Sequence, residues 1–194
     1  VDGMMRADAA AGAMKLLRDR HGPMLEWEDV PTIWEGWGPF TGHQAIVSDD
    51  TIGVQDEPRP AGQRSLVHTS GCMVGYALSK RVLGVMPTGP GFETCDIRPY
   101  AGNISWARGA YPTPLGDLCV DWQIEQGQME LKVDVPEGIA ATVTLPRALG
   151  RAGKLVQDGE CLLLDDGPAA PDIMVASDEV QIQNVTGSHV FALR

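Results

Sequence analysis

The fold is decided by the stretch from Asp117 to Val135, which reads DLCVDWQIEQGQMELKVDV. Apolar and polar side chains alternate on both sides of a turn signal at Gln126-Gly127. A period of two places successive side chains on opposite faces of an extended strand. The stretch therefore predicts two neighbouring β-strands. Trp122 falls on the core side of the first strand, and Cys119 falls on its polar side.

The alternation continues toward the C-terminus. The next apolar set follows Pro136-Glu137-Gly138 and comprises Ile139, Ala141, Val143 and Leu145. Shorter apolar runs come after it, at Lys154–Val156, Cys161–Leu164, Ile173–Val175, Val180–Ile182 and Val190–Leu193. Short, regularly spaced strands with turn signals between them are typical of an antiparallel β-sandwich.

Upstream of about residue 88 the apolar period is helical instead. Residues 4–20 predict a helix that stops at Gly22-Pro23. Its apolar face would comprise Met5, Ala9, Ala13, Leu16 and Leu17. A second helix is predicted from Ser65 onward, with Val74, Leu78 and Val82 repeating every four residues and Gly84 as the cap. A long polar stretch, residues 38–64, lies between the two.

We therefore expect an α plus β chain in two parts, residues 1–87 and 88–194. Two helices and a long loop cannot bury their own apolar faces. The helical part must either pack on the β domain or form the end of a larger helical domain. We favour the second, and the absence of an initiator Met before Val1 agrees with it.

Charge and composition exclude several classes of function. The formal net charge is −11, which argues against nucleic acid and against an anionic membrane surface, whereas a neutral ligand such as a carbohydrate is compatible with it. No apolar run approaches the roughly 20 residues that span a bilayer, no secretion signal is visible, and the compartment is left open. No Cys-x-x-Cys pair suggests zinc or redox chemistry, so we expect no cofactor and no metal. The four cysteines are expected to be isolated thiols, mostly buried.

The stretch Trp34-Glu35-Gly36-Trp37 is the strongest candidate for a chemical site. A carboxylate among indole rings loses hydration, and desolvation raises its pKa toward the range that suits proton transfer near neutral pH. Aromatic faces beside a carboxylate are also a common way to hold a sugar ring. The alternative is a packed helix start at which Glu35 caps backbone N–H groups. His68, after the long polar stretch, is either a structural residue or part of the same site.

Four landmarks, in order, make residues 10–146 resemble the C-terminal part of the α-L-rhamnosidases of glycoside hydrolase family 78. Two of them contain the candidate site residues, namely Thr32-Ile33-Trp34-Glu35-Gly36-Trp37 and Ser65-Leu66-Val67-His68. The third is Val82–Pro87 with Gly89–Phe92, and the fourth is Trp106–Gly109 with Pro112–Gly116.

The resemblance implies that residues 1–87 are the last helices of an (α/α)6 barrel and that residues 88–194 are the C-terminal β-sandwich. It implies hydrolysis of terminal α-L-rhamnosides with inversion at the anomeric carbon. Glu35 would be the general base, and Trp34, Trp37 and His68 would contact the sugar. The general acid would come from an earlier barrel segment, and this chain shows no counterpart. The expected partners are a rhamnose-containing glycoside and the rest of the catalytic chain.

One departure and three alternatives accompany this interpretation. Many members of the family carry Gly-Trp or Ala-Trp after the histidine, where this chain has Thr69-Ser70, so the aromatic wall of the site differs. Related (α/α)6 enzymes such as the unsaturated-uronyl hydrolases are a further alternative, although they lack this appended sandwich order. The chain could instead be a non-catalytic carbohydrate-binding module, with Trp106 or Trp122 as a stacking platform, or a purely structural domain.

Overall fold

The computed structural model describes residues 4, 10–26, 73–149, 153–164 and 171–194 of the chain. Two compact units are present, residues 1–77 and residues 78–194. The boundary predicted near residue 88 lies inside the second unit. Strand β1 (Val85–Pro87) already pairs there with β2 (Thr94–Ile97).

The first unit contains helices α2 (Ala10–Glu26) and α3 (Met73–Ala77). Helix α2 buries Ala13, Met14 and Leu17, as the apolar spacing predicted for two of them, whereas Leu16 is 40% exposed. At about 100° per residue, Leu16 lies well to the side of the buried stripe. The helix also continues through Gly22-Pro23, so the predicted stop there is wrong. Proline removes one backbone donor from a helix, and here that loss does not end it.

The second unit opens with η1 (Leu78–Leu83), a π-helical segment that ends at Gly84. The backbone N–H of Gly84 donates to the carbonyl of Ser79 at 3.0 Å, which is the five-residue bond of a π-turn. Val82 and Leu83 are buried, whereas Leu78 is 37% exposed. The predicted spacing of four assumed an α-helix, and the wider π-turn moves Leu78 off the buried face.

Gly84 ends this segment for a steric reason, which confirms the predicted cap. Its φ of +93° lies in the left-handed region, and a Cβ at this position would stand 2.5 Å from the backbone carbon of Arg98. Arg98 donates its backbone N–H to the carbonyl of Gly84 at 2.9 Å. Only glycine allows the two backbones to approach this closely.

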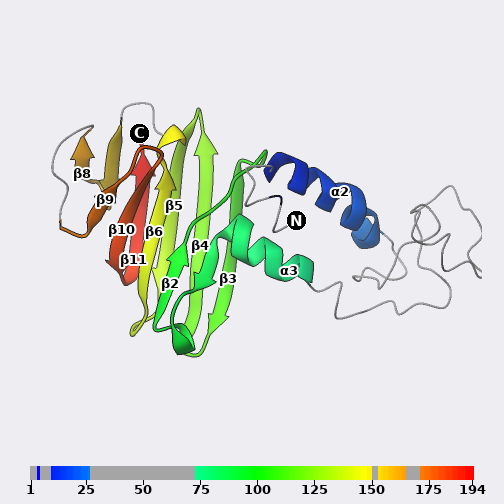
Figure 1. Cartoon of the computed structure of the whole chain (residues 1–194), viewed down its shortest axis with the longest axis horizontal. Coiled ribbons are helices and arrows are strands. Elements are labelled where there is room, and N and C mark those ends of the chain that lie inside the picture. Colours follow the sequence, from blue (N-terminus) through cyan, green and yellow to red (C-terminus); the bar gives the residue numbers. More distant parts are fainter. Residues whose placement is uncertain (1–3, 5–9, 27–72, 150–152, 165–170) are drawn as a thin grey trace, which may run out of the picture. The chain divides into compact units, whose positions relative to one another are not determined.

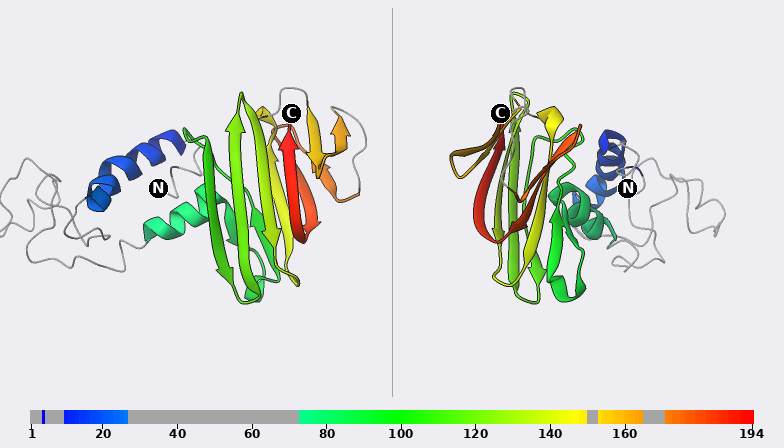
Figure 2. Two further views of the ribbon diagram at one scale, coloured as in Figure 1. Left: turned by 180° about the vertical axis from the view of Figure 1, so that it is seen from behind. Right: turned by 60° about the vertical axis from the view of Figure 1, so that its left-hand side comes forward.

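Two sheets of the second unit lie face to face (Figure 1, and Figure 2 from two further sides). The first has the strand order β1-β2-β6-β10-β9, and the second has the order β3-β4-β5-β11-β7-β8. The remaining strands of the first sheet are β6 (Ala140–Pro146), β9 (Ile173–Val175) and β10 (Glu179–Val185). Those of the second are β3 (Trp106–Thr113), β4 (Gly116–Glu125), β5 (Gln128–Val135), β7 (Lys154–Gln157), β8 (Glu160–Leu164) and β11 (Gly187–Leu193). Short 3-10 segments are η2 (Pro90–Phe92) and η3 (Arg147–Leu149).

The predicted antiparallel sandwich is confirmed, with one exception in its pairing. Every pair among the described strands is antiparallel apart from β2 and β6, which run parallel. A parallel pair needs a long crossover connection. Here that connection passes through β3, β4 and β5 of the opposite sheet before the chain returns as β6.

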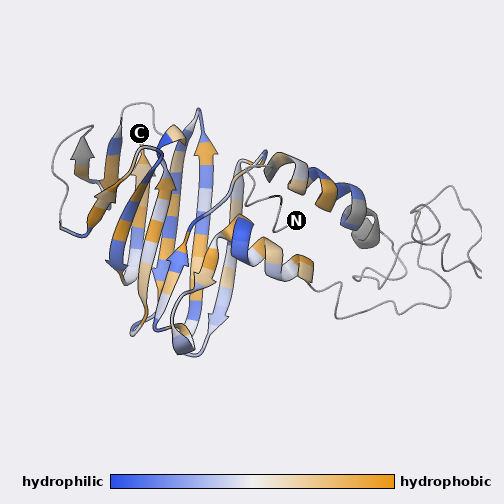
Figure 3. Cartoon of the chain, in the orientation of Figure 1, coloured by the Kyte–Doolittle hydropathy of each residue, from blue (hydrophilic) through white to orange (hydrophobic). Residues whose placement is uncertain are grey.

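The core lies between the sheets and is built from the alternate residues of each strand. Figure 3 shows the alternation as apolar and polar bands along β4 and β5. The largest fully buried side chains include Trp122, Phe191, Leu131, Leu118 and Leu145. Full burial of one such side chain is worth about 1.5–3 kcal/mol, so these positions carry much of the stability of the second unit.

Trp122 also joins the π-helical segment to the sandwich. Its indole Nε1–H donates to the backbone carbonyl of Val82 at 2.9 Å, in a buried bond. Trp122 is 0% exposed, which confirms its predicted place on the core side of β4. A buried indole N–H needs such a partner, and the Val82 carbonyl supplies it.

Candidate functional site

The residues predicted for catalysis lie outside the described part of the chain. Trp34, Glu35, Trp37 and His68 all fall within residues 27–72, between the end of α2 and the start of α3. Their roles remain predictions. The site that the structure does describe lies on the second unit, on the outward face of its six-stranded sheet.

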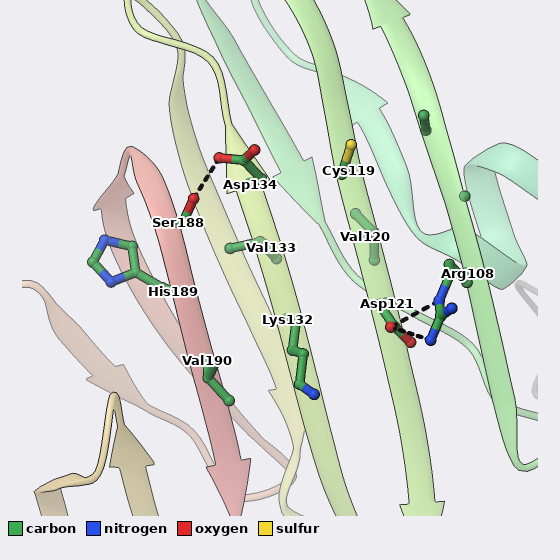
Figure 4. A pocket seen from close by; sticks show the side chains of 12 residues that line it. Arg108, Cys119, Val120, Asp121, Lys132, Val133, Asp134, Ser188, His189 and Val190 are labelled. Carbon is green, nitrogen blue, oxygen red and sulfur yellow. Dashed lines mark hydrogen bonds and ion pairs between the residues drawn. The ribbon is translucent and has the colours of Figure 1, made fainter.

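Two rows of side chains cross β3, β4, β5 and β11 on this face. The strand register places Ala110, Cys119, Asp134 and Ser188 in the first row. It places Arg108, Asp121, Lys132 and Val190 in the second. These eight residues line a hollow of about 660 Å³ (Figure 4), and we call them the open face.

Short side chains create the hollow. Ala110, Cys119 and Ser188 reach only a short way above the sheet, so space remains between them and the long side chains of the second row. Neighbouring strands lie about 4.8 Å apart, so the residues of one row stand close enough to contact one ligand together. Alternation in the sequence predicted which residues of β4 and β5 face outward, but not those of β3, and the rows depend on strand register.

The charged groups of the open face are held by one another. The Nε–H of Arg108 donates to Oδ2 of Asp121 at 2.8 Å, and a terminal nitrogen of Arg108 forms an ion pair with the same oxygen at 2.8 Å. The ammonium of Lys132 lies 3.3 Å from a carboxylate oxygen of Glu130, two residues away on β5. The hydroxyl of Ser188 donates to Asp134 at 2.7 Å. The face therefore offers oriented donors and acceptors with its two cations already paired.

Trp106 stands at the end of the same face. It pairs in register with the exposed Gln123, and its neighbour Ala107 pairs with the buried Trp122. Trp106 is 67% exposed. Of the two tryptophans considered as stacking platforms, Trp122 is therefore excluded by burial, and Trp106 is accessible.

A second polar cluster lies at the turn between β7 and β8. The Nδ1 of His189 is 2.6 Å from a carboxylate oxygen of Asp158, and its Nε2 is 3.0 Å from the carbonyl of Thr186. The other Asp158 oxygen accepts the backbone N–H of Val190 at 2.8 Å. The hydrogen bond from His189 is the largest cause that lowers the pKa of Asp158. These hydrogen bonds attach the β7–β8 turn to strand β11, so we interpret the cluster as structural.

The cysteines match their prediction only in part. Cys95, Cys119 and Cys161 are free thiols, but only Cys95 is buried. Burial, and then the charge of Asp96, raise the pKa of the Cys95 thiol to about 11, which keeps it protonated and unreactive. Cys119 lies on the polar side of β4, as predicted. Cys72 lies outside the described residues.

Two further findings concern metals and membranes. Within the described ranges, no three His, Cys, Asp or Glu side chains come together as a group that could hold a metal ion. Across the same ranges, none of the helices is both long enough and apolar enough to cross a membrane.

Comparison with known proteins identifies what the second unit resembles. Residues 84–160 match the family described as the bacterial alpha-L-rhamnosidase C-terminal domain. An alpha-L-rhamnosidase of Alteromonas sp. (strain LOR) is 28% identical over 116 residues, which is 59% of this chain and 11% of that protein.

Solved structures agree with this similarity. The GH78 family rhamnosidase of Bacillus sp. GL1 is 28% identical, with a TM-score of 0.58 over 75% of this chain and 14% of that one. The alpha-L-rhamnosidase of Dictyoglumus thermophilum shares the fold, with a TM-score of 0.66 and 20% identity over 88% of this chain and 17% of that one. The chain thus spans only a small part of the length of each of these proteins.

Proposed function

We propose a glycosidase function for this chain, which is related to the C-terminal part of α-L-rhamnosidases. In this proposal it belongs to a longer protein that removes terminal α-L-rhamnose from rhamnosides. The match of residues 84–160 to the rhamnosidase C-terminal domain carries the proposal. The two motifs that contain Glu35 and His68 precede this match in the chain, in the order that the resemblance implies.

Glu35 is the proposed general base. An inverting glycosidase uses two carboxyl groups about 6.5–9.5 Å apart, which leaves room for a water molecule between the base and the sugar. The base takes a proton from that water, which then attacks the anomeric carbon from the face opposite the leaving group. The indoles of Trp34 and Trp37 would exclude other water and raise the pKa of Glu35.

The general acid is proposed to come from another part of the longer protein. It must protonate the glycosidic oxygen while Glu35 activates water, and neither step is fast without the other. His68 is proposed to hydrogen-bond a sugar hydroxyl. By this account the first unit contributes one half of the catalytic pair, and the second unit, residues 78–194, forms the sandwich that completes the fold.

Hydrolysis of an aryl α-L-rhamnoside tests the proposal. The longer protein should release rhamnose as the β-anomer first, which proton NMR detects before mutarotation. The 194-residue chain alone should show no turnover, because it lacks the acid. Initial release of the α-anomer by the longer protein would contradict the inverting mechanism, and robust turnover by the chain alone would contradict the missing acid.

The alternative is a carbohydrate-binding or structural module with no part in catalysis. The exposure of Trp106 favours saccharide binding by the sandwich. It is compatible with the catalytic proposal, since the two sites use different residues.

A further inference from the structure

We propose that the open face, together with Trp106, binds a neutral saccharide at a site separate from the proposed catalytic residues. The kind of sugar, a rhamnose-containing chain, rests on the proposed function, whereas the site itself rests on the geometry of the second unit. Trp106 is the proposed platform for a sugar ring, and the open face would bind the hydroxyl groups of the next ring.

Trp106 has the position that such a platform needs. The C–H groups on one face of a sugar ring are slightly positive and pack on the electron-rich face of an indole. Trp106 is 67% exposed, so one face of its large indole ring is accessible to a ligand. The next outward residues on β3 are Arg108 and Ala110, and both line the hollow. Two residues along a strand span about 7 Å, so ring and hollow are close enough for one short saccharide.

The polar groups of the open face suit hydroxyl groups. A hydrogen bond and an ion pair to Asp121 orient Arg108, which keeps further N–H donors for a ligand. Asp134 has acceptor capacity beyond its bond from Ser188, and Gln123 presents an exposed amide beside Trp106. A planar guanidinium, carboxylate or amide group can bind two adjacent hydroxyl groups of a sugar, because its two polar atoms reach both hydroxyl oxygens.

The charges of the face favour a neutral ligand over the other classes. Arg108 and Lys132 are paired with Asp121 and Glu130, so little positive field remains to attract an anion. The chain as a whole carries a formal charge of −11, which opposes a polyanion further. Most of the surface that lines the hollow is apolar, with a few charged and polar side chains among it, which is the usual make-up of a site for a small neutral ligand.

Calorimetric titration of the 194-residue chain tests the site. The probes are L-rhamnose and a rhamnose-containing oligosaccharide, and the variants are W106A and W106F. We expect the oligosaccharide to bind, W106A to weaken binding about tenfold or more, and W106F to retain most of it. The matched control is M174A, since Met174 is 54% exposed but lies on β9 of the other sheet. M174A should bind as the wild type does.

A second comparison separates this site from the catalytic one. The double variant Trp34→Ala/Trp37→Ala removes the proposed catalytic platform and should keep the binding that depends on Trp106. Binding that survives W106A but is lost in the double variant would overturn the inference and support the catalytic site. No binding up to about 10 mM oligosaccharide would also overturn it. If W106A loses oligosaccharide binding and the double variant keeps it, the inference is upheld, even if the longer protein fails to hydrolyse rhamnosides.

Discussion

Trp122 joins parts of the chain that are 40 residues apart. Its ring fills the centre of the core, and its N–H satisfies the carbonyl of Val82 at the end of the π-helical segment. The same side chain fills the core and bonds to Val82. The register of β4 therefore also fixes where the π-helical segment η1 contacts the sheet. The position of Trp122 was predictable from alternation alone, but its hydrogen-bond partner was not, because Val82 precedes it by so many residues.

Replacement of Trp122 by Phe should destabilise the second unit. The variant leaves the Val82 carbonyl buried without its donor, which costs about 1–3 kcal/mol, and it also opens space in the core. Urea denaturation followed by circular dichroism measures the change in the free energy of unfolding. The matched control is W106F on the exposed face, expected within about 0.5 kcal/mol of the wild type. Equal stability of the two variants would contradict this account of Trp122.

At the scale of elements, the turn between β7 and β8 depends on a side-chain contact from another strand. Asp158 has a φ of +51°, in the left-handed region, and Gly159 follows it with a φ of +90°. Such a two-residue turn suits the twist of a hairpin. Asp158 then contacts β11 through His189 and the N–H of Val190. The turn residues could be read from the sequence, whereas the contact with β11 could not.

Asp158→Asn should lower stability at neutral pH and have less effect in acid. The pKa of Asp158 is lowered in the folded chain from its ordinary value of 3.8. A lowered carboxyl pKa contributes stability above the unfolded-state value, and this is lost as the pH falls through the folded-state value. The difference at pH 7 should be at most about 1 kcal/mol, since the pair is exposed and screened.

Denaturation series at pH 7 and at a pH below 3.8 check this expectation. The control is Asp117→Asn, an exposed carboxylate on β4, which should change stability little. A difference for Asp158→Asn that grows as the pH falls would contradict the role given to the His189 contact.

Strand prediction succeeded where alternation or an apolar run was clear and failed where the pattern was interrupted. The strands from β4 onward were predicted, because apolar residues recur at every second position in β4, β5 and β6 and form short runs in the later strands. Strands β1 and β2 were not, since Gly89-Pro90-Gly91 lies between them and β2 has no run of apolar residues. Strand β3 was not either, because Gly109 and Pro112 interrupt its pattern.

At the scale of the whole molecule, the candidate sites could be predicted to different extents. The motif around Glu35 was found from residue chemistry and from resemblance, and it lies outside the described residues. The open face was not found, because it exists only when β3, β4, β5 and β11 lie side by side. A hollow of this kind depends on register between distant segments, which local pattern does not encode. Trp106 was recognised as a candidate platform, but its exposure required the structure.

The rate of the Glu35→Gln variant tests the central claim most directly. The variant is made in the longer protein and compared with Glu28→Gln, a nearby carboxylate with no proposed role in the reaction. We predict that Glu35→Gln lowers kcat for an aryl α-L-rhamnoside by about 10²–10⁴-fold, while Glu28→Gln leaves it unchanged. An unchanged kcat for Glu35→Gln in a folded protein would contradict the claim that this chain supplies the general base.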